Sequence, residues 1–169
     1  INVDSEEEGV LTVSCAGGSV TRCTLPVERA AFAGTSLKVS VSGLAGGHSG
    51  VEIHKERGNA NKLLGRFLWR LYLEEINAGL ISAQGGLADN AIPRETKFSI
   101  LVPTEQSEAF ETAVATFEKE AKAELATKDP GFFISVKQNG RVQKNAVCGN
   151  DFAVAAAFTI ATGEAMANL

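Results

Sequence analysis

The chain has few cysteines and histidines, no excess of positive charge and no long hydrophobic run. Its three cysteines, Cys15, Cys23 and Cys148, are odd in number and form no CxxC pair, so neither a disulfide framework nor a zinc knuckle is supported. Its 16 basic and 20 acidic side chains give a net charge of −4, which argues against nucleic acid as the main partner. A membrane span is not expected, because no run of about 18 apolar residues occurs.

These absences favour a reducing compartment. Without a disulfide pattern, we expect three buried free thiols in the cytoplasm. Residues 1–4 show neither an initiator methionine nor the basic-then-apolar order of a signal peptide. They resemble the middle of a strand, which favours a chain cut from a longer one. A length of 169 residues suits one domain, or one domain plus a fragment of another.

Hydrophobic periodicity predicts alternating strands and helices. Strands are predicted at 10–13, 37–42, 80–85, 98–102 and 132–138, and 20–32 is β-prone with Pro26 at a bend or an edge. Apolar side chains at helical spacing predict helices at 59–77 and 107–125, with Gly79 ending the first and Ser107 capping the second. Residues 86–93 are expected to be a loop and 129–131 a turn. A last, alanine-rich helix is expected from Asn150 or Asp151 to about residue 167.

The order of these elements from Leu37 to Gln138 predicts an α+β fold. The order is β-α-β-β-α-β, and two helices on one face of a four-stranded antiparallel sheet would bury the apolar stripes. This arrangement is the ferredoxin-like sandwich. The segments before Pro26 and after Asn145 stand outside the repeat and flank it.

His48 is the most prominent candidate for chemistry, since it stands in the run Gly46-Gly47-His48-Ser49-Gly50. Glycines let a backbone turn sharply and approach a ligand closely. An imidazole held there can donate a hydrogen bond or bind a metal. The chain holds only two histidines, and His54 is off the i, i+4 spacing of a helical metal pair. Chemistry at His48 therefore needs partners from elsewhere, and His54 is expected to be a surface or supporting residue.

Two further segments allow both a structural and a functional interpretation. Asp4 opens an acidic turn that ends at Gly9, which is either a solvated charge run or a source of a carboxylate ligand for a dication. Asn90 opens Asn90-Ala91-Ile92-Pro93-Arg94, which is either an ordinary Asx-type turn or a segment whose amide hydrogen-bonds a substrate. The residues themselves leave both questions open.

Taken together, four segments resemble the aminoacylhistidine dipeptidases, which cleave Xaa-His dipeptides and belong to the co-catalytic zinc peptidases. The segments occur in the same order and are Asn2–Gly9, Cys15–Gly18, Gly46–Asn61 and Asn90–Arg94. Gly46–Asn61 is the most specific of them, and the resemblance covers nearly the whole chain. It implies a metallo-dipeptidase in which a β-α-β-β-α-β lid domain is inserted into a domain with two zinc ions, and members commonly dimerise through the lid.

By this resemblance, residues 26–145 are expected to be the lid and dimerisation domain. Residues 1–25 are then a remnant of the zinc catalytic domain. Residues 146–169 are a C-terminal helix that either stays with the lid or returns to the catalytic domain. We thus expect a homodimer formed through the lid and a dipeptide substrate.

The resemblance also implies roles for three residues. Asp4 matches a zinc ligand, and Asn90 matches an asparagine that contacts substrate from the lid. His48 matches a lid histidine that polarises the scissile carbonyl, in dimeric members that of the partner subunit. The family's other metal ligands and its general-base glutamate have no counterpart in this sequence. The isolated chain is therefore expected to hold no stoichiometric zinc and to be inactive.

Two alternatives belong to other functional classes. A free-standing ferredoxin-like regulatory module would bind a small ligand, such as a free amino acid, saturably. A purely structural dimerisation domain would contribute nothing to an active site, and replacing His48 by alanine would then leave kcat/KM unchanged. Neither explains the glycine run around His48 as well as the dipeptidase interpretation does.

Overall fold

In the computed structural model, strands and helices alternate along the described residues, which are 8–11, 13–14, 21–162 and 167–168. The elements are β1 (Ala30–Ser42), β2 (Gly47–His48), α1 (Ala60–Leu73), β3 (Gly79–Gly85), β4 (Ala91–Ile92), β5 (Thr96–Val102), α2 (Ser107–Leu125), β6 (Phe133–Ala146), α3 (Gly149–Thr162) and β7 (Ala167–Asn168). Short 3-10 turns lie at Ile53–Lys55 and Thr104–Gln106.

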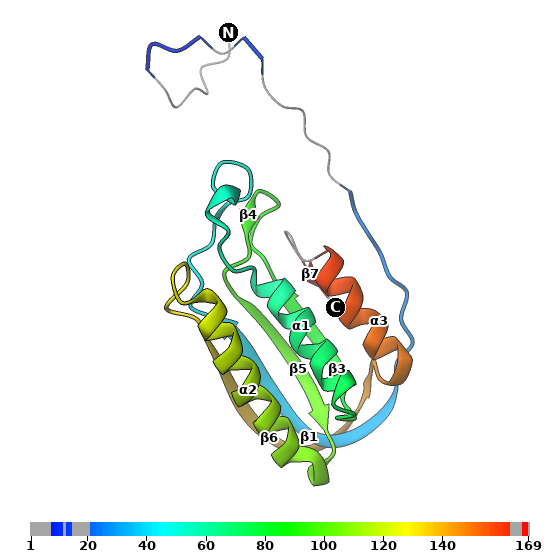
Figure 1. The fold of residues 1–169 in the computed structure, drawn as a ribbon. Coiled ribbons are helices and arrows are strands. Elements are labelled where there is room, and N and C mark those ends of the chain that lie inside the picture. Colours follow the sequence, from blue (N-terminus) through cyan, green and yellow to red (C-terminus); the bar gives the residue numbers. More distant parts are fainter. Residues whose placement is uncertain (1–7, 12, 15–20, 163–166, 169) are drawn as a thin grey trace.

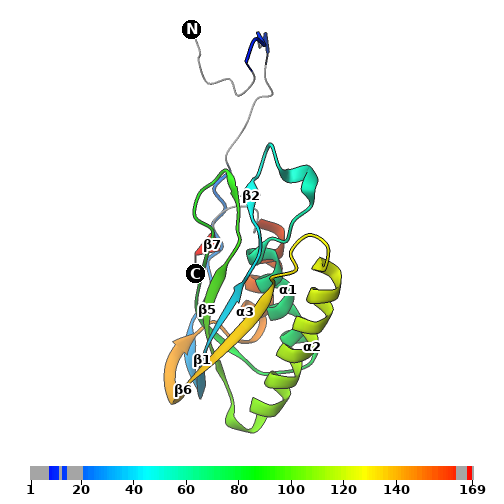
Figure 2. The ribbon, with the colours of Figure 1, turned by 90° about the vertical axis from the view of Figure 1, so that its left-hand side faces the viewer.

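The main sheet has the strand order β6-β1-β5-β3-β7, and all its pairs are antiparallel. Its four long strands, with α1 and α2 on one face, make the ferredoxin-like arrangement, so the predicted fold class is confirmed (Figure 1). Beyond this arrangement the structure has the predicted C-terminal helix, α3, and the two-residue strand β7. Figure 2 shows that α3 lies on the same face of the sheet as α1 and α2.

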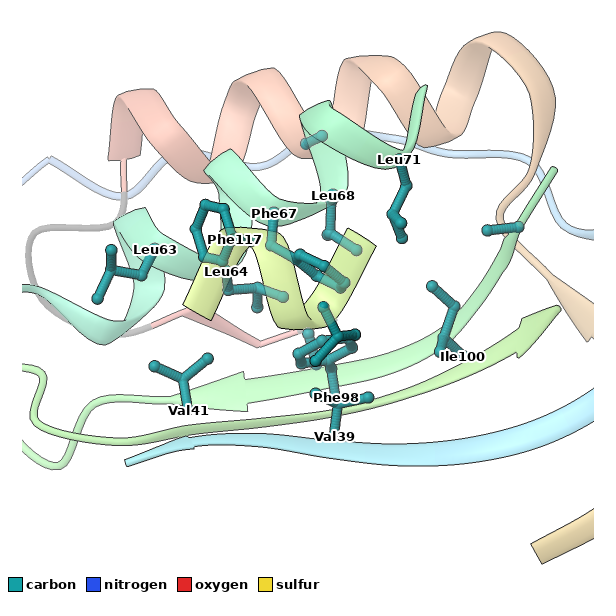
Figure 3. Close-up of a cluster of buried hydrophobic side chains, with 14 of the residues drawn as sticks. Val39, Val41, Leu63, Leu64, Phe67, Leu68, Leu71, Phe98, Ile100 and Phe117 are labelled. Carbon is teal, nitrogen blue, oxygen red and sulfur yellow. The ribbon is translucent and has the colours of Figure 1, made fainter. Parts of the chain in front are cut away.

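The core lies between this sheet face and the helices. The predicted stripe of α1 is buried as expected, with Leu64 and Leu68 at 0% exposure. Phe67 stands at the centre of the core, where its ring contacts those of Phe98, Phe110 and Phe117 at centroid distances of 6.1, 5.8 and 5.4 Å (Figure 3). Packing of this apolar face stabilises the helix far more than its intrinsic propensity does.

The predicted strand at 10–13 is wrong for the residues that the structure describes there. Val10, Leu11 and Val13 have no regular structure, and Leu11 and Val13 are 92% and 95% exposed. A short apolar run forms a strand only when another strand pairs with it. The β-prone segment 20–32 likewise contributes to β1 only from Ala30 onward. Cys23, which precedes β1, is exposed, so its expected burial is also wrong, whereas Cys148 is half-buried. Cys15 lies outside the described residues.

Helix α1 ends four residues before the predicted boundary, at Leu73, and Gly79 belongs to β3. Two residues after Leu73, Glu75 has a left-handed φ of 54°, which stops the helix from continuing. The Glu75 N–H donates to the Tyr72 carbonyl at 3.2 Å, and the Ile76 N–H donates to the Leu71 carbonyl at 2.9 Å. These two bonds form a Schellman motif, in which glycine is the usual residue at the left-handed position. The prediction that the helix ends at Gly79 is therefore wrong.

We expect Glu75→Gly to stabilise the fold by about 0.5–1 kcal/mol. The left-handed conformation costs a non-glycine residue about 1–2 kcal/mol, and the greater chain entropy of glycine offsets about 0.5–1 kcal/mol of that gain. Urea unfolding followed by circular dichroism measures the change. The matched control is Glu74→Gly at φ −85°, where glycine relieves nothing and stability should fall. A loss of stability in Glu75→Gly would contradict the strain argument.

The other predicted helix caps are also corrected by the structure. Ser107 is the first residue of α2 and follows a 3-10 turn, and no side chain caps that helix. Helix α3 begins at Gly149, so Asn150 and Asp151 lie in its first turn. The Asp151 carboxylate accepts the Glu28 N–H at 2.9 Å and ties the segment before β1 to α3. At its other end α3 reaches Thr162, and residue 167 belongs to β7.

Strand β6 is twice as long as predicted. It pairs with β1 from Phe133 to Ala146, with an irregularity between Thr35 and Leu37. The prediction stopped at Gln138 because the polar residues that follow show no alternation. Pairing with β1, which no local pattern reveals, extends the strand.

Candidate functional site

The two short strands β2 and β4 form a separate ribbon that projects beyond the end of the main sheet (Figures 1 and 2). His48 is opposite Ala91 in this ribbon, and the Ser49 N–H donates to the Asn90 carbonyl at 2.9 Å. Two residues singled out from the sequence, His48 and Asn90, are thereby neighbours, and both are exposed. Asp4, the third, lies outside the described residues.

The imidazole of His48 is held by the backbone that follows it. Its Nδ1 accepts the N–H of Gly50 at 3.0 Å and that of Val51 at 3.2 Å. Because Nδ1 accepts in both bonds, the neutral ring carries its proton on Nε2. The exposed ring therefore presents Nε2–H as a hydrogen-bond donor.

Two glycines before His48 have backbone conformations that other residues avoid. Gly46 has φ +66° and Gly47 has φ +138°. A Cβ on Gly47 would lie 2.6 Å from the Glu52 carboxylate and 2.7 Å from the Arg57 guanidinium. The glycine run thus lets charged side chains close over the strand that carries His48, which is a structural use of the freedom seen in the sequence.

Glu52 is the centre of these contacts. Its carboxylate accepts the His48 N–H at 2.9 Å and a hydrogen bond from Lys55 at 2.5 Å, and Arg57 lies 3.4 Å away. Arg57 also donates to the Gly46 carbonyl. The hydrogen bond from Lys55, followed by that from the His48 N–H, lowers the pKa of Glu52 from 4.5 to about 2. The loop is therefore braced internally around an ionised glutamate.

We expect this brace to be lost in acid. Because the folded-state pKa of Glu52 lies below 4.5, its contribution is complete above that pH and disappears as the pH falls towards about 2. Side-chain carboxyl NMR should show Glu52 titrating near pH 2. Lys55→Met removes the largest cause and should raise this pKa towards the ordinary value. An unchanged midpoint in that variant would show that Lys55 does not hold the carboxylate.

Asp129, which the sequence predicts only as part of a turn, supports the base of the same loop. The Asp129 side chain is 2% exposed. Its Oδ1 accepts the Ala45 N–H and its Oδ2 accepts the Gly58 N–H, both at 2.6 Å. The local signal of Asp-Pro-Gly is a turn, and nothing in the pattern indicates partners 84 and 71 residues away.

A cavity of about 360 Å³ adjoins the ribbon and is lined in part by Gly46, Gly47, Leu87, Ala91 and Arg94. Arg94, exposed two residues after β4, is the cationic group on this wall. Within the described part of the chain, no three histidine, cysteine or acidic side chains lie close enough to hold a metal ion. No helix in that part is long and apolar enough to cross a membrane.

Fold and site together define a ferredoxin-type domain that presents a histidine and an asparagine on a ribbon at one end. Comparison with known proteins specifies it further. Residues 39–129 match the peptidase dimerisation domain, and the chain belongs to that family. The match runs from β1 to Asp129 and so includes the ribbon and both ends of its loop. The resemblance found in the sequence is confirmed.

Two relatives are enzymes much longer than this chain. The chain is 45% identical over 131 residues to the cytosol non-specific dipeptidase of Escherichia coli K12, a match covering 76% of this chain and 27% of that protein. It superposes on the crystal structure of aminoacylhistidine dipeptidase from Vibrio alginolyticus with a TM-score of 0.65 and 31% identity, covering 83% of this chain and 27% of that one. The chain thus spans 27% of the length of each relative.

Proposed function

We propose that this domain is the lid of a dipeptidase and that His48 donates a hydrogen bond to the scissile carbonyl of the substrate. The observation that carries the proposal is the pair of backbone bonds to Nδ1, which leaves Nε2–H as the donor. A donor fixed before the reaction stabilises the charge that develops on the carbonyl oxygen. A ring whose Nδ1 is already occupied by two donors is suited to this role rather than to metal ligation through that atom.

Asn90 is proposed to contact the same substrate. Its backbone carbonyl accepts the Ser49 N–H, so Asn90 lies beside the segment that carries His48. For the substrate, we propose an Xaa-His dipeptide. This rests on the motifs around His48 and Asn90 and on the name of the Vibrio relative, while the Escherichia relative is named a non-specific dipeptidase. A cytoplasmic location rests on the name of the latter, the cytosol dipeptidase.

Any metal of this enzyme is proposed to be bound mainly by residues outside this chain. The described residues offer no cluster suited to a metal ion, and Asp4 is proposed as one ligand from the resemblance alone. Two zinc ions in the complete enzyme are part of the same proposal. Helix α3 is proposed to stay with the lid, because Phe152, Ala155 and Ala156 belong to the same buried core as α1 and the sheet.

The test compares the longer protein that contains this chain with the chain alone. The longer protein should hydrolyse Xaa-His dipeptides and contain zinc by elemental analysis. The 169-residue chain should do neither. Zinc at one equivalent on the chain alone, or peptide cleavage by it, would overturn this division of roles. Saturable binding of a free amino acid to the chain alone would favour a regulatory module instead.

A homodimer is proposed to form along β6. This strand is the outermost of the sheet on its side, and Phe133 and Val136 on it are 45% and 41% exposed. An open strand edge with apolar side chains favours pairing with a second copy. Sedimentation should give twice the chain mass of 17.7 kDa. Val136→Lys should weaken the dimer, whereas Val154→Lys, at the similarly exposed Val154 of α3 (47%), should not.

A further inference from the structure

The turn between α2 and β6 supports the loop that carries His48. This loop, residues 45–58, follows β1 and ends just before α1. Its first and last backbone N–H groups, those of Ala45 and Gly58, each donate to one oxygen of Asp129. A single buried carboxylate therefore joins the two ends of the loop.

Only a carboxylate satisfies both ends. Its two oxygens accept two N–H groups, whereas an asparagine offers one acceptor and would direct its NH₂ group at the other N–H. Hydrogen bonds to an ionised acceptor are shorter and about twice as strong as neutral ones, in keeping with the two distances of 2.6 Å. Burying a charge costs much free energy unless it is fully hydrogen-bonded. The two loop ends supply these bonds.

Two further contacts attach the loop region to the same turn. Gly43 and Gly131 approach so closely that a Cβ on Gly43 would lie 1.8 Å from the Gly131 carbonyl oxygen. Lys128 forms an ion pair with Glu56 of the loop. The turn thus holds the loop through backbone packing, an exposed ion pair and the buried Asp129.

The loop is also braced between its ends, so that a shift of the ends moves His48. Arg57, next to Gly58, donates to the Gly46 carbonyl, and Glu52 accepts the His48 N–H. We propose that Asp129 is a positioning residue for His48, which fixes the direction of Nε2–H by holding both ends of the loop. The inference rests on the proposed function for its effect on catalysis, but not for its effect on loop geometry.

The test uses Asp129→Asn with two independent readouts. In the 169-residue chain, nitrogen-15 NMR of the imidazole should show the Nε2–H form alone. The variant should add a population protonated on Nδ1 and speed amide exchange at Gly50 and Val51. In the longer enzyme, kcat should fall about 10- to 100-fold with little change in KM, since a displaced catalytic group costs a factor of that order.

Val114→Ala is the matched control, because Val114 is a buried residue of α2 (8% exposed), eleven residues before the helix ends at Leu125. It should lower stability yet leave the His48 tautomer and kcat unchanged. Should Asp129→Asn fail to fold, Gly58→Ala replaces it. The added Cβ would lie 2.8 Å from a Leu44 methyl carbon and 3.3 Å from Asp129 Oδ2, so it displaces one loop end and should change the tautomer in the same direction.

Two results would overturn the proposal: an unchanged His48 tautomer in the loop-end variants, or an equal change in Val114→Ala. The function is judged separately by His48→Ala. If that variant keeps full activity while Asp129→Asn still shifts the tautomer, the positioning role stands and the catalytic role of His48 fails.

Discussion

Replacing His48 by alanine in the complete enzyme should lower kcat/KM by about 100- to 1000-fold, the usual cost of removing one oxyanion donor. The structure gives the reason in the two backbone bonds to Nδ1, which direct the proton to Nε2. Alanine keeps the His48 N–H and hence its bond to Glu52. Gly50 and Val51 lose their bonds to Nδ1, but both residues are exposed and their N–H groups can bond to water. The loop should therefore keep its Glu52 brace, and the loss should appear mainly in kcat. Steady-state kinetics with an Xaa-His dipeptide measures it.

His54→Ala is the control for this substitution. His54 lies in the same loop, in the exposed 3-10 turn Ile53–Lys55, and its loss should leave kcat/KM within about twofold because it touches no proposed reacting group. Zinc content and sedimentation should be equal in both variants. Unchanged kcat/KM in His48→Ala would remove the catalytic role and leave a purely structural dimerisation domain.

Gly43→Ala should destabilise the domain by about 1.5–4 kcal/mol. A left-handed residue with a Cβ costs about 1–2 kcal/mol, of which the lower chain entropy of alanine offsets about 0.5–1 kcal/mol, and Gly43 has φ +82°. Its Cβ would also meet the Gly131 carbonyl oxygen at 1.8 Å, which only a backbone shift relieves, and such shifts cost about 1–3 kcal/mol. Urea unfolding measures the sum. The displaced turn carries Asp129, so the His48 loop should loosen as well.

Gly140→Ala separates the two causes. Gly140 has almost the same conformation, φ +88°, but no atom lies within 4 Å of its ideal Cβ. It should cost only the conformational part, which after the entropy offset is about 0.5–1 kcal/mol. Equal losses at the two glycines would mean that the contact between Gly43 and Gly131 contributes nothing.

The sequence predicts the buried residues correctly wherever apolar side chains recur with the period of a helix or a strand. The stripe of α2, from Phe110 to Leu125, is buried as predicted, and Leu37, Val39 and Val41 of β1 face the core. These patterns define the layers, since one face of each element must be apolar. The β-α-β-β-α-β order then leaves few topologies, and the ferredoxin-like one is observed.

Prediction failed where a partner distant in the chain decides the structure. The strand β4 lies in the segment 86–93, which the sequence predicts as a loop, and β2 lies in the glycine run, where no strand is predicted; each has two residues. Asp129 looked like an ordinary turn residue because both its partners are far away. The glycine run identified His48 and its surroundings, but its most direct use, room for Glu52 and Arg57, appears only in three dimensions.

The span between Asp129 and the loop also sets an order of events during synthesis. Ala45 and Gly58 leave the ribosome 84 and 71 residues before the carboxylate that ties them together. Until then the nascent loop lacks its anchor, although the internal brace by Glu52 is already present. Joining residues this far apart in the chain costs only slightly more entropy than joining nearer ones, because the cost grows slowly with loop length. The segment that carries the most specific motif is thus anchored only once residue 129 has been made, and chains interrupted before it should display His48 without a fixed direction.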